Sequence, residues 1–318
     1  MTAKEWCVPP SFFLGVLVAV QISLLSSCSY ASIQNPAEKT AELKPPPLYV
    51  KAELSPREVV PGKVTLITVA LIEDPMQREV NGEFQGIEVP FFPMPEQGSG
   101  VYGALLGIPY EQKQGLARVR VRVADGKKSP VEFDLPVQIS EGQYPSEKLK
   151  VDSSRVSPTK KKVLARIKRE QLEVAELYKR VTRRRYWKGP FSLPIQSAVT
   201  SSFGTRRVFN GSLKNYHPGL DLKAAMKTPV RAAAGGEVVL AKDLFYTGKT
   251  VMVDHGYGII TLYAHLSRLK VKKGQTIQSR DLVGLSGNTG RVNGPHLHWQ
   301  AVVHKVKVDP IGLTEVLQ

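Results

Sequence analysis

All six histidines of this 318-residue chain lie in its last third, and two short segments combine them in patterns suited to metal binding. The first segment pairs His217 with Asp221, four residues apart across a Pro-Gly bend that can bring both side chains onto one ion. The second holds His296 and His298, separated by one apolar residue, so in a strand both imidazoles point to the same face. Imidazole nitrogen and carboxylate oxygen are ligands that zinc accepts. Together the two segments predict a metal site.

Each segment alone is weak, because a lone histidine is usually a structural residue and two histidines one residue apart can simply lie on an edge strand. A third segment adds weight: His265 ends an apolar run that begins at Ile259. We place the last two histidines outside the site. His255 is predicted to lie in a turn with a structural hydrogen bond, and His304 is predicted to face solvent between Val303 and Lys305.

Other catalytic patterns are missing from the sequence. It has no His-Glu-x-x-His segment, and Ser286 lacks the spacing of a nucleophile elbow, so we interpret Ser286 as a turn residue. The chain has two cysteines, Cys7 and Cys28. A mature chain that begins at Cys28 has no cysteine pair for an internal disulfide, and a downstream metal site must use histidine and carboxylate ligands.

These motifs resemble those of the lysostaphin/LytM-type metallopeptidases, peptidase family M23. The resemblance extends from about Phe191 to the C-terminus. It rests on His217-x-x-x-Asp221, Tyr263-Ala264-His265-Leu266 and Gly294-Pro295-His296-Leu297-His298, with further matches at Ser202-Phe203-Gly204 and Gly287-Asn288-Thr289-Gly290-Arg291.

The resemblance implies that His217, Asp221 and His298 bind Zn²⁺ and that His265 and His296 form a catalytic pair. Two neutral imidazoles and one carboxylate leave such a site cationic, so that a water on zinc can reach a pKa near ~7. One unligated histidine can then take its proton while the other donates a hydrogen bond to the oxyanion. Which histidine does which stays open. The implied substrate is the stem peptides or cross-bridges of peptidoglycan.

Two other functions remain as alternatives. Some proteins similar to this family have lost metal ligands and act as non-catalytic regulators of cell-wall amidases, and the chain could also serve mainly as a wall-binding protein. All five matching positions are intact here. No function other than metal-dependent catalysis requires these five side chains together, so we favour a zinc metalloendopeptidase.

Charge gives an independent hint about the partner. The composition, with 42% hydrophobic and 23% charged residues, is that of an ordinary globular protein and excludes a disordered or fibrous chain. Lysine and arginine number 44 against 28 acidic residues, a net charge of +16. This excess favours an anionic partner, either nucleic acid or an anionic polymer of the cell envelope.

The N-terminus favours the envelope. Residues 1–27 are predicted to be a signal peptide, since Lys4 precedes an apolar stretch too short to span a bilayer comfortably. Leu25-Ser26-Ser27-Cys28 resembles a lipobox, which implies a lipid anchor at Cys28 and a membrane-anchored lipoprotein facing the periplasm or the exterior. Removal of Cys28 by ordinary signal peptidase, with a cut as late as Ala31, remains open. Residues 28–47, ending in three prolines, are predicted to be an extended tether.

Residues 48–145 are predicted to form an Ig-like β-sandwich. In one run Ala117, Val119, Val121 and Val123 alternate with three arginines, which gives one buried and one solvated face. A second run with the same period follows from 131 to 139, and Asp125-Gly126 between them indicates a hairpin.

Residues 146–190 are predicted to be a basic helical linker, with Ser157-Pro158 at its start and Leu164, Ile167, Gln171, Val174, Tyr178 and Val181 on its apolar side. The run of Arg183 to Arg185 beside Tyr186 and Trp187 suits either nucleic acid or a solvated helix face, and an exported protein favours the solvated face. We therefore expect no nucleic-acid partner. Residues 191–318 complete a mainly β fold with an antiparallel peptidase sheet.

Overall fold

The computed structural model of the protein describes residues 17–18, 49–72, 78–124, 130–149, 159–209 and 213–317. Most of the predicted signal peptide, the tether and Cys28 lie outside the described residues, as do Asp125-Gly126 and Ser157-Pro158. Within the described parts of the chain, no helix is both long enough and apolar enough to cross a membrane.

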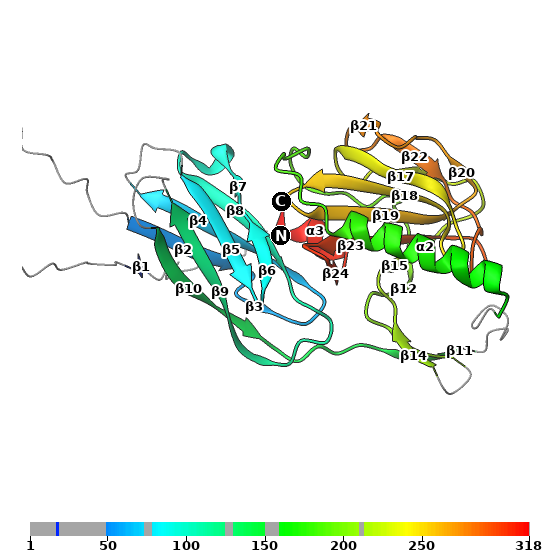
Figure 1. Cartoon of the computed structure of the whole chain (residues 1–318), viewed down its shortest axis with the longest axis horizontal. Helices are drawn as coiled ribbons and strands as arrows, with labels where there is room; N and C mark the ends of the chain where they lie inside the picture. Colours follow the sequence, from blue (N-terminus) through cyan, green and yellow to red (C-terminus); the bar gives the residue numbers. More distant parts are fainter. Residues whose placement is uncertain are drawn as a thin grey trace, which may run out of the picture.

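The first half of the described chain is a β-sandwich (Figure 1). One sheet has the order β1-β2-β4-β8-β7 and the other β3-β10-β9-β5-β6, and all neighbours are antiparallel except β3 and β10. The 3-10 helix η1 (Pro95–Gln97) follows β7. The strands are β1 (Leu17–Val18), β2 (Tyr49–Ser55), β3 (Glu58–Val59), β4 (Val64–Ile72), β5 (Glu79–Phe84), β6 (Ile87–Pro90), β7 (Phe92–Pro93), β8 (Val101–Gly107), β9 (Gly115–Ala124) and β10 (Val131–Ile139).

Strand β9 shows how the sequence builds the sandwich. Val119, Val121 and Val123 are buried in a core that both sheets share, while the arginines between them are exposed. The strand pairs antiparallel with β10, with Val123 opposite Val131, as expected for the predicted hairpin. Arg120 lies 3.6 Å from Asp134 across the pair. The alternation of apolar and polar residues therefore predicted the pairing of β9 with β10 correctly. The assignment of the sandwich to the Ig-like class stays a prediction.

Helix α2 spans Lys161–Tyr178, so its first residue lies three positions after Pro158 of the predicted start. Its N-cap residue is Lys160, which makes no side-chain capping bond. Its buried residues are Ile167 and Glu170. The predicted apolar residue Leu164 is instead 45% exposed. The predicted residues Val174 and Tyr178 do pack against the core of the large sheet. The apolar period missed the buried carboxylate of Glu170, which accepts hydrogen bonds from Arg166 and from the backbone N–H of Phe245.

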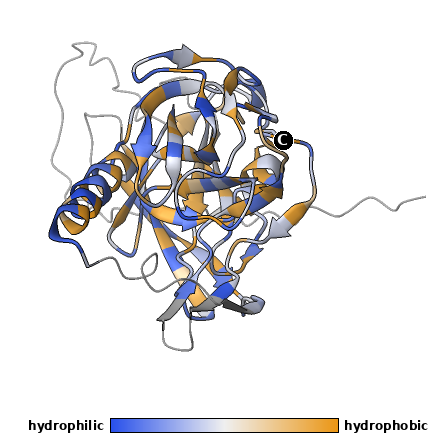
Figure 2. Ribbon diagram, turned by 90° about the vertical axis from the view of Figure 1, so that its right-hand side faces the viewer, coloured by the Kyte–Doolittle hydropathy of each residue, from blue (hydrophilic) through white to orange (hydrophobic). Residues whose placement is uncertain are grey.

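The second half of the chain is built on an eight-stranded sheet, so the mainly β fold is confirmed. Its order is β12-β15-β23-β19-β18-β17-β21, with β24 paired to β23 and every pair antiparallel. In Figure 2, hydrophobic segments (orange) and hydrophilic segments (blue) alternate along the strands. The strands are β12 (Val199–Ser201), β15 (Leu220–Lys223), β17 (Gly236–Leu244), β18 (Gly248–Gly256), β19 (Ile259–Leu266), β21 (Thr276–Ile277), β23 (His296–Val303) and β24 (Val306–Val308).

Two small sheets and a short helix complete this half. One sheet has the order β11-β13-β14 and the other β16-β22-β20. Helix α3 (Ile311–Val316) lies between the large sheet and the sandwich (Figure 1). The strands are β11 (Ser146–Leu149), β13 (Arg206–Phe209), β14 (Leu213–Tyr216), β16 (Pro229–Arg231), β20 (Arg268–Leu269) and β22 (Leu282–Leu285).

The arginine run after α2 joins the two halves and is not a solvated helix face. Helix α2 ends at Tyr178, before the run begins. Trp187 is 2% exposed, and its ring lies 5.2 Å from Phe92 of the sandwich in an edge-on contact. Arg183 pairs with Glu88 at 2.9 Å, and Arg185 pairs with Glu96 at 2.7 Å. Contacts within the protein therefore account for the basic and aromatic residues that also suited nucleic acid.

Candidate metal centre

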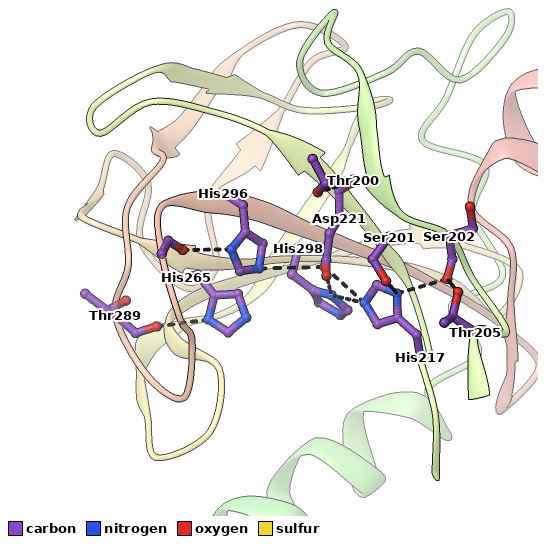
Figure 3. A network of polar contacts seen from close by, with 11 residues as sticks. Thr200, Ser201, Ser202, Thr205, His217, Asp221, His265, Thr289, His296 and His298 are labelled. Carbon is purple, nitrogen blue, oxygen red and sulfur yellow. Dashed lines mark hydrogen bonds and ion pairs between the residues drawn. The ribbon is translucent and has the colours of Figure 1, made fainter. Parts of the chain in front are cut away.

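Three side chains predicted as metal ligands meet at one edge of the large sheet (Figure 3). Asp221 in β15 and His298 in β23 are direct partners across an antiparallel strand pair, which brings their Cβ atoms close together. His217 follows the end of β14 and reaches the same point across Pro218 and Gly219. The bend and the strand pair therefore bring together residues that are 81 positions apart in the sequence.

The ligand atoms of these residues form a tight triangle. Asp221 Oδ1 lies 3.0 Å from His217 Nε2 and 2.8 Å from His298 Nδ1, and the two nitrogens are 3.0 Å apart. All three residues are buried. A cation bound at about 2.0–2.2 Å from each atom would balance a carboxylate and two nitrogen lone pairs that otherwise crowd one another. The donor set therefore fits zinc.

Position 219 has no room for a side chain, so it requires glycine. A β-carbon there would lie 2.6 Å from the carbonyl oxygen of Trp299 and 2.7 Å from the ring of His298. Both contacts are far inside van der Waals distance. The close approach of the bend to β23 is what allows His217 to reach the Asp221–His298 pair.

The ring of His217 is oriented by the loop that carries Ser202. Its Nδ1 lies 3.1 Å from the carbonyl oxygen of Ser202 and 3.3 Å from the hydroxyl of Ser201. Because a carbonyl oxygen can only accept, Nδ1 carries the proton and donates to it. The lone pair of the neutral ring is then on Nε2, which faces the triangle. This is the arrangement that metal-binding histidines usually have.

Asp221 is held as a carboxylate. Burial alone would raise its pKa, but the close contacts with the imidazoles of His217 and His298 outweigh burial and hold the pKa well below its usual range. The site therefore presents an anionic oxygen throughout the physiological pH range.

His265 and His296 lie beside the triangle with their rings 4.9 Å apart. The Nδ1 of His265 donates to the carbonyl oxygen of Thr289 at 2.9 Å, and that of His296 donates to the carbonyl oxygen of Gly294 at 2.9 Å. Each neutral ring then keeps its lone pair on Nε2. His296 Nε2 lies 3.7 Å from Asp221 Oδ1, which places this lone pair at the edge of the triangle.

His265 sits in an unusual backbone conformation at the end of β19. Its φ of 61° is in the left-handed region, which is uncommon for a residue with a β-carbon. The backbone N–H of His265 donates to the carbonyl oxygen of Thr247 at 2.8 Å, which holds the residue in place. Burial lowers the pKa of the imidazole to about 3, so the ring is neutral near pH 7.

All five residues singled out in the sequence therefore lie together. The groups that sequence reasoning missed are the backbone carbonyls that fix the rings, chiefly those of Ser202 and Thr289. Both residues lie in motifs noted above, but a side-chain pattern carries no sign of a carbonyl's role. The side chain of Thr289 adds support, because its hydroxyl donates to Leu266 and accepts the N–H of Lys249.

The remaining two histidines are structural. His255 is fully buried in β18, with its ring nitrogens bonded to Gly235 and Thr261. The structural role is as predicted, although the residue lies in a strand and not in a turn. The prediction for His304 was wrong. It is 4% exposed and its Nε2 donates to the carbonyl oxygen of Tyr257, because the tight turn after β23 folds the ring back onto Gly258.

These buried histidines should make the protein less stable in mild acid. Burial lowers the pKa of His304 to about 4 and that of His255 to about 4. Between about pH 6.5, where an unfolded histidine titrates, and about pH 4, the unfolded chain binds protons that the folded chain does not. The free energy of unfolding should therefore fall as pH falls through this window, by about 3 kcal/mol for each histidine.

Urea unfolding of metal-free protein at a series of pH values measures this loss. His304→Asn removes one titrating group, and asparagine tolerates the φ of 47° at this position. This variant should lose stability less steeply in acid. Lys305→Asn, at the next residue of the same turn, is the matched control and should keep the wild-type slope. Equal slopes in wild type and His304→Asn would contradict the prediction.

The part of the chain that carries this site is similar to known proteins. Residues 215–310 match the model of peptidase family M23. Over 113 residues, 35% of this chain and 26% of the relative, the chain is 41% identical to the peptidoglycan DD-endopeptidase ShyA of Vibrio cholerae. Over 128 residues, 40% of this chain and 30% of the relative, it is 34% identical to the DD-carboxypeptidase/endopeptidase Mpg of Neisseria meningitidis. The matches thus span about a quarter to a third of these relatives.

A crystal structure from Pseudomonas aeruginosa, described as a peptidase of the M23 type, resembles both halves of the chain. It has a TM-score of 0.62 and 28% identity, and the match covers 81% of this chain and 95% of that one. The similarity therefore includes the sandwich as well as the large sheet. The family model, the relatives and this structure agree with the motifs at the site. Residues 215–310 of this chain therefore form a domain that matches peptidase family M23.

Proposed function

We propose that the protein is a zinc-dependent endopeptidase that cleaves peptide bonds in the stem peptides or cross-bridges of peptidoglycan. The observation that carries this proposal is the triangle of His217 Nε2, Asp221 Oδ1 and His298 Nδ1, with two further imidazoles beside it. The division into a sandwich, a linker and a peptidase domain over residues 191–318 belongs to the same proposal.

In this proposal three buried side chains bind the metal, and two further imidazoles take part in proton transfer and hydrogen bonding. Zinc bound there supplies a Lewis acid that polarises the scissile carbonyl and lowers the pKa of a coordinated water. His265 and His296 each direct an Nε2 lone pair toward the site, since their Nδ1 atoms are occupied by backbone carbonyls. One ring accepts the proton of the attacking water, and the other takes up a proton from solvent at Nε2 and then donates a hydrogen bond to the developing oxyanion.

The substrate class follows from the relatives and from charge. Two relatives carry names that include an endopeptidase activity, and one of these names specifies peptidoglycan. The net charge of +16 suits a polymer rich in carboxylates. Long-range attraction of this kind raises the rate of encounter and leaves the choice of bond to the residues around the site.

Purified protein incubated with isolated peptidoglycan tests the function directly. Mass spectrometry of the released muropeptides should show cleaved peptides, a chelator should abolish their release, and added zinc should restore it. A non-catalytic regulator would release nothing itself but would speed a cell-wall amidase. A wall-binding protein would remain on the polymer without cleaving it. Either of the last two results would overturn the proposal.

We further propose that the protein is anchored in the cell envelope by a lipid on Cys28, on the basis of the Leu25-to-Cys28 motif. Cys28→Ser should move the protein out of the membrane fraction or block its processing, because serine has no thiol for the lipid to modify. Fractionation and intact mass measure the effect. Cys7→Ser changes the other cysteine, which lies outside the motif, and should leave both unchanged. Identical fractionation and mass for wild type and Cys28→Ser would rule out the anchor.

A further inference from the structure

We propose that the sandwich positions the metal centre: Tyr110, at the tip of the sandwich, fixes the loop that orients the proposed ligand His217. Tyr110 is thus a positioning residue and not a catalytic one. This inference rests on the proposed function, since it requires that His217 bind the metal. It assigns a role to the sandwich that the peptidase motifs do not reveal.

The three ligands are not equally supported by the fold. Asp221 and His298 lie on neighbouring strands, and each of these strands also pairs with another strand on its other side, so backbone pairing on both sides fixes them. His217 lies on the connection between β14 and β15, and β14 belongs to a small separate sheet. The position of His217 therefore depends on the segments that contact this connection.

The loop from Ser202 to Thr205 provides those contacts. The backbone of His217 makes two hydrogen bonds with it, donating to the carbonyl oxygen of Thr205 at 2.9 Å and accepting the N–H of Gly204 at 2.9 Å. The ring donates to the carbonyl oxygen of Ser202, which also accepts the hydroxyl of Thr205 at 2.9 Å. A displacement of this loop would therefore move both the backbone and the ring of His217.

Tyr110 connects the sandwich to both sides of this arrangement. Its hydroxyl donates to the carbonyl oxygen of Gly204 at 2.9 Å. Its ring stacks on Tyr216, the residue before His217, with centroids 4.0 Å apart and planes inclined by 12°. One side chain of the sandwich thus contacts the loop and the segment that carries the ligand.

Around Tyr110, side chains of the sandwich and of the Ser202-to-Thr205 loop pack closely against glycines of the opposite part. Phe203 of the loop packs over Gly62 of the sandwich, where a β-carbon would lie 2.4 Å from its ring. In the opposite direction, Tyr144 packs over Gly204, where a β-carbon would lie 2.1 Å from the Tyr144 ring. An ion pair between Lys63 and Asp309 at 2.6 Å closes the same interface. The loop is therefore held by shape as well as by the Tyr110 hydrogen bond.

The test compares Tyr110→Phe and Tyr110→Leu in the full chain loaded with zinc. Tyr110→Phe loses the hydrogen bond and keeps the stacked ring, whereas Tyr110→Leu loses both. Zinc release to a chelating dye should be about three- to tenfold faster in Tyr110→Phe and about 10- to 100-fold faster in Tyr110→Leu. The visible spectrum of the cobalt-substituted protein should change in the same order, since it reports the geometry of the ligands.

Tyr102→Phe is the matched control, because Tyr102 lies in the same sandwich and its hydroxyl accepts the backbone N–H of Arg78 far from the site. It should release zinc at the wild-type rate. If both Tyr110 variants lower the melting temperature but keep the wild-type release rate and cobalt spectrum, the sandwich only packs against the peptidase sheet and the inference is wrong. If wild-type protein binds no metal, the proposed function fails as well. Tyr110→Phe keeps the packing intact, so it remains informative even if Tyr110→Leu does not fold.

Discussion

His298→Ala should lose bound zinc and peptidoglycan cleavage together. The variant removes one of three nitrogen or oxygen atoms that lie within 3.0 Å of one another, and it leaves the Asp221 carboxylate buried without its 2.8 Å partner. Losing a residue that only supports a ligand typically costs about 10- to 100-fold in metal affinity, and losing a ligand should cost more. Metal analysis after dialysis, in parallel with turnover on isolated peptidoglycan, measures both quantities.

Gln300→Ala is the matched control for this variant. Gln300 lies two residues further along β23, so its side chain points to the same face, but it donates to Tyr178 of α2 and is outside the metal centre. This control should keep its zinc. His217→Ala and Asp221→Ala should behave like His298→Ala, and high added zinc should restore part of the activity. Full metal retention in any of the three would refute the ligand set.

His265→Ala should keep its zinc and still lose cleavage, by on the order of 10² to 10⁴ in rate. The ring of His265 is outside the ligand triangle, and its Nδ1 is occupied by the carbonyl oxygen of Thr289. Removing it deletes a proton acceptor or an oxyanion donor without deleting a ligand. His296→Ala should show the same pattern, because its Nδ1 is bonded to Gly294 in the same way. Zinc content and turnover rate, measured on the same samples, separate the two roles.

A buried histidine outside the site provides the control for these two variants. His304→Asn removes an imidazole that contacts Tyr257 and should leave both zinc content and turnover close to wild type near pH 7. If His265→Ala cleaves as fast as wild type, the catalytic role is wrong. If His296→Ala loses as much zinc as His298→Ala, the division between ligand and catalytic residue is wrong.

The sequence predicted which five side chains lie together because side-chain chemistry and strand alternation are both visible in a motif. His296 and His298 point to one face of β23 for the same reason that Val119 and Val121 point to one face of β9. The contacts that orient the rings come from backbone carbonyls, such as that of Ser202, and these have no side-chain pattern. His304 was misplaced because a tight turn can bury a polar residue whose neighbours alternate normally.

The linker was harder to predict because its residues are fixed by distant parts of the chain. Arg185 and Trp187 look like a solvent-facing or nucleic-acid-binding pair until Phe92 and Glu96 of the sandwich are placed beside them. Helix α2 was recognised by its period, but its buried carboxylate, Glu170, could not be distinguished from an exposed one. In each case the deciding partner is more than 70 residues away, as with Phe245 and Glu170.

The core shared by the two halves limits how the chain can be divided. Val64, Leu66 and Leu105 of the sandwich belong to the same buried cluster as Trp187, Phe191 and Val308 of the second half. A fragment that begins at Phe191 would leave behind Trp187 and the whole sandwich face, and would expose this apolar surface to water. Such a fragment should aggregate or resist purification. Biochemical work on this peptidase therefore needs the sandwich and the large sheet on one polypeptide.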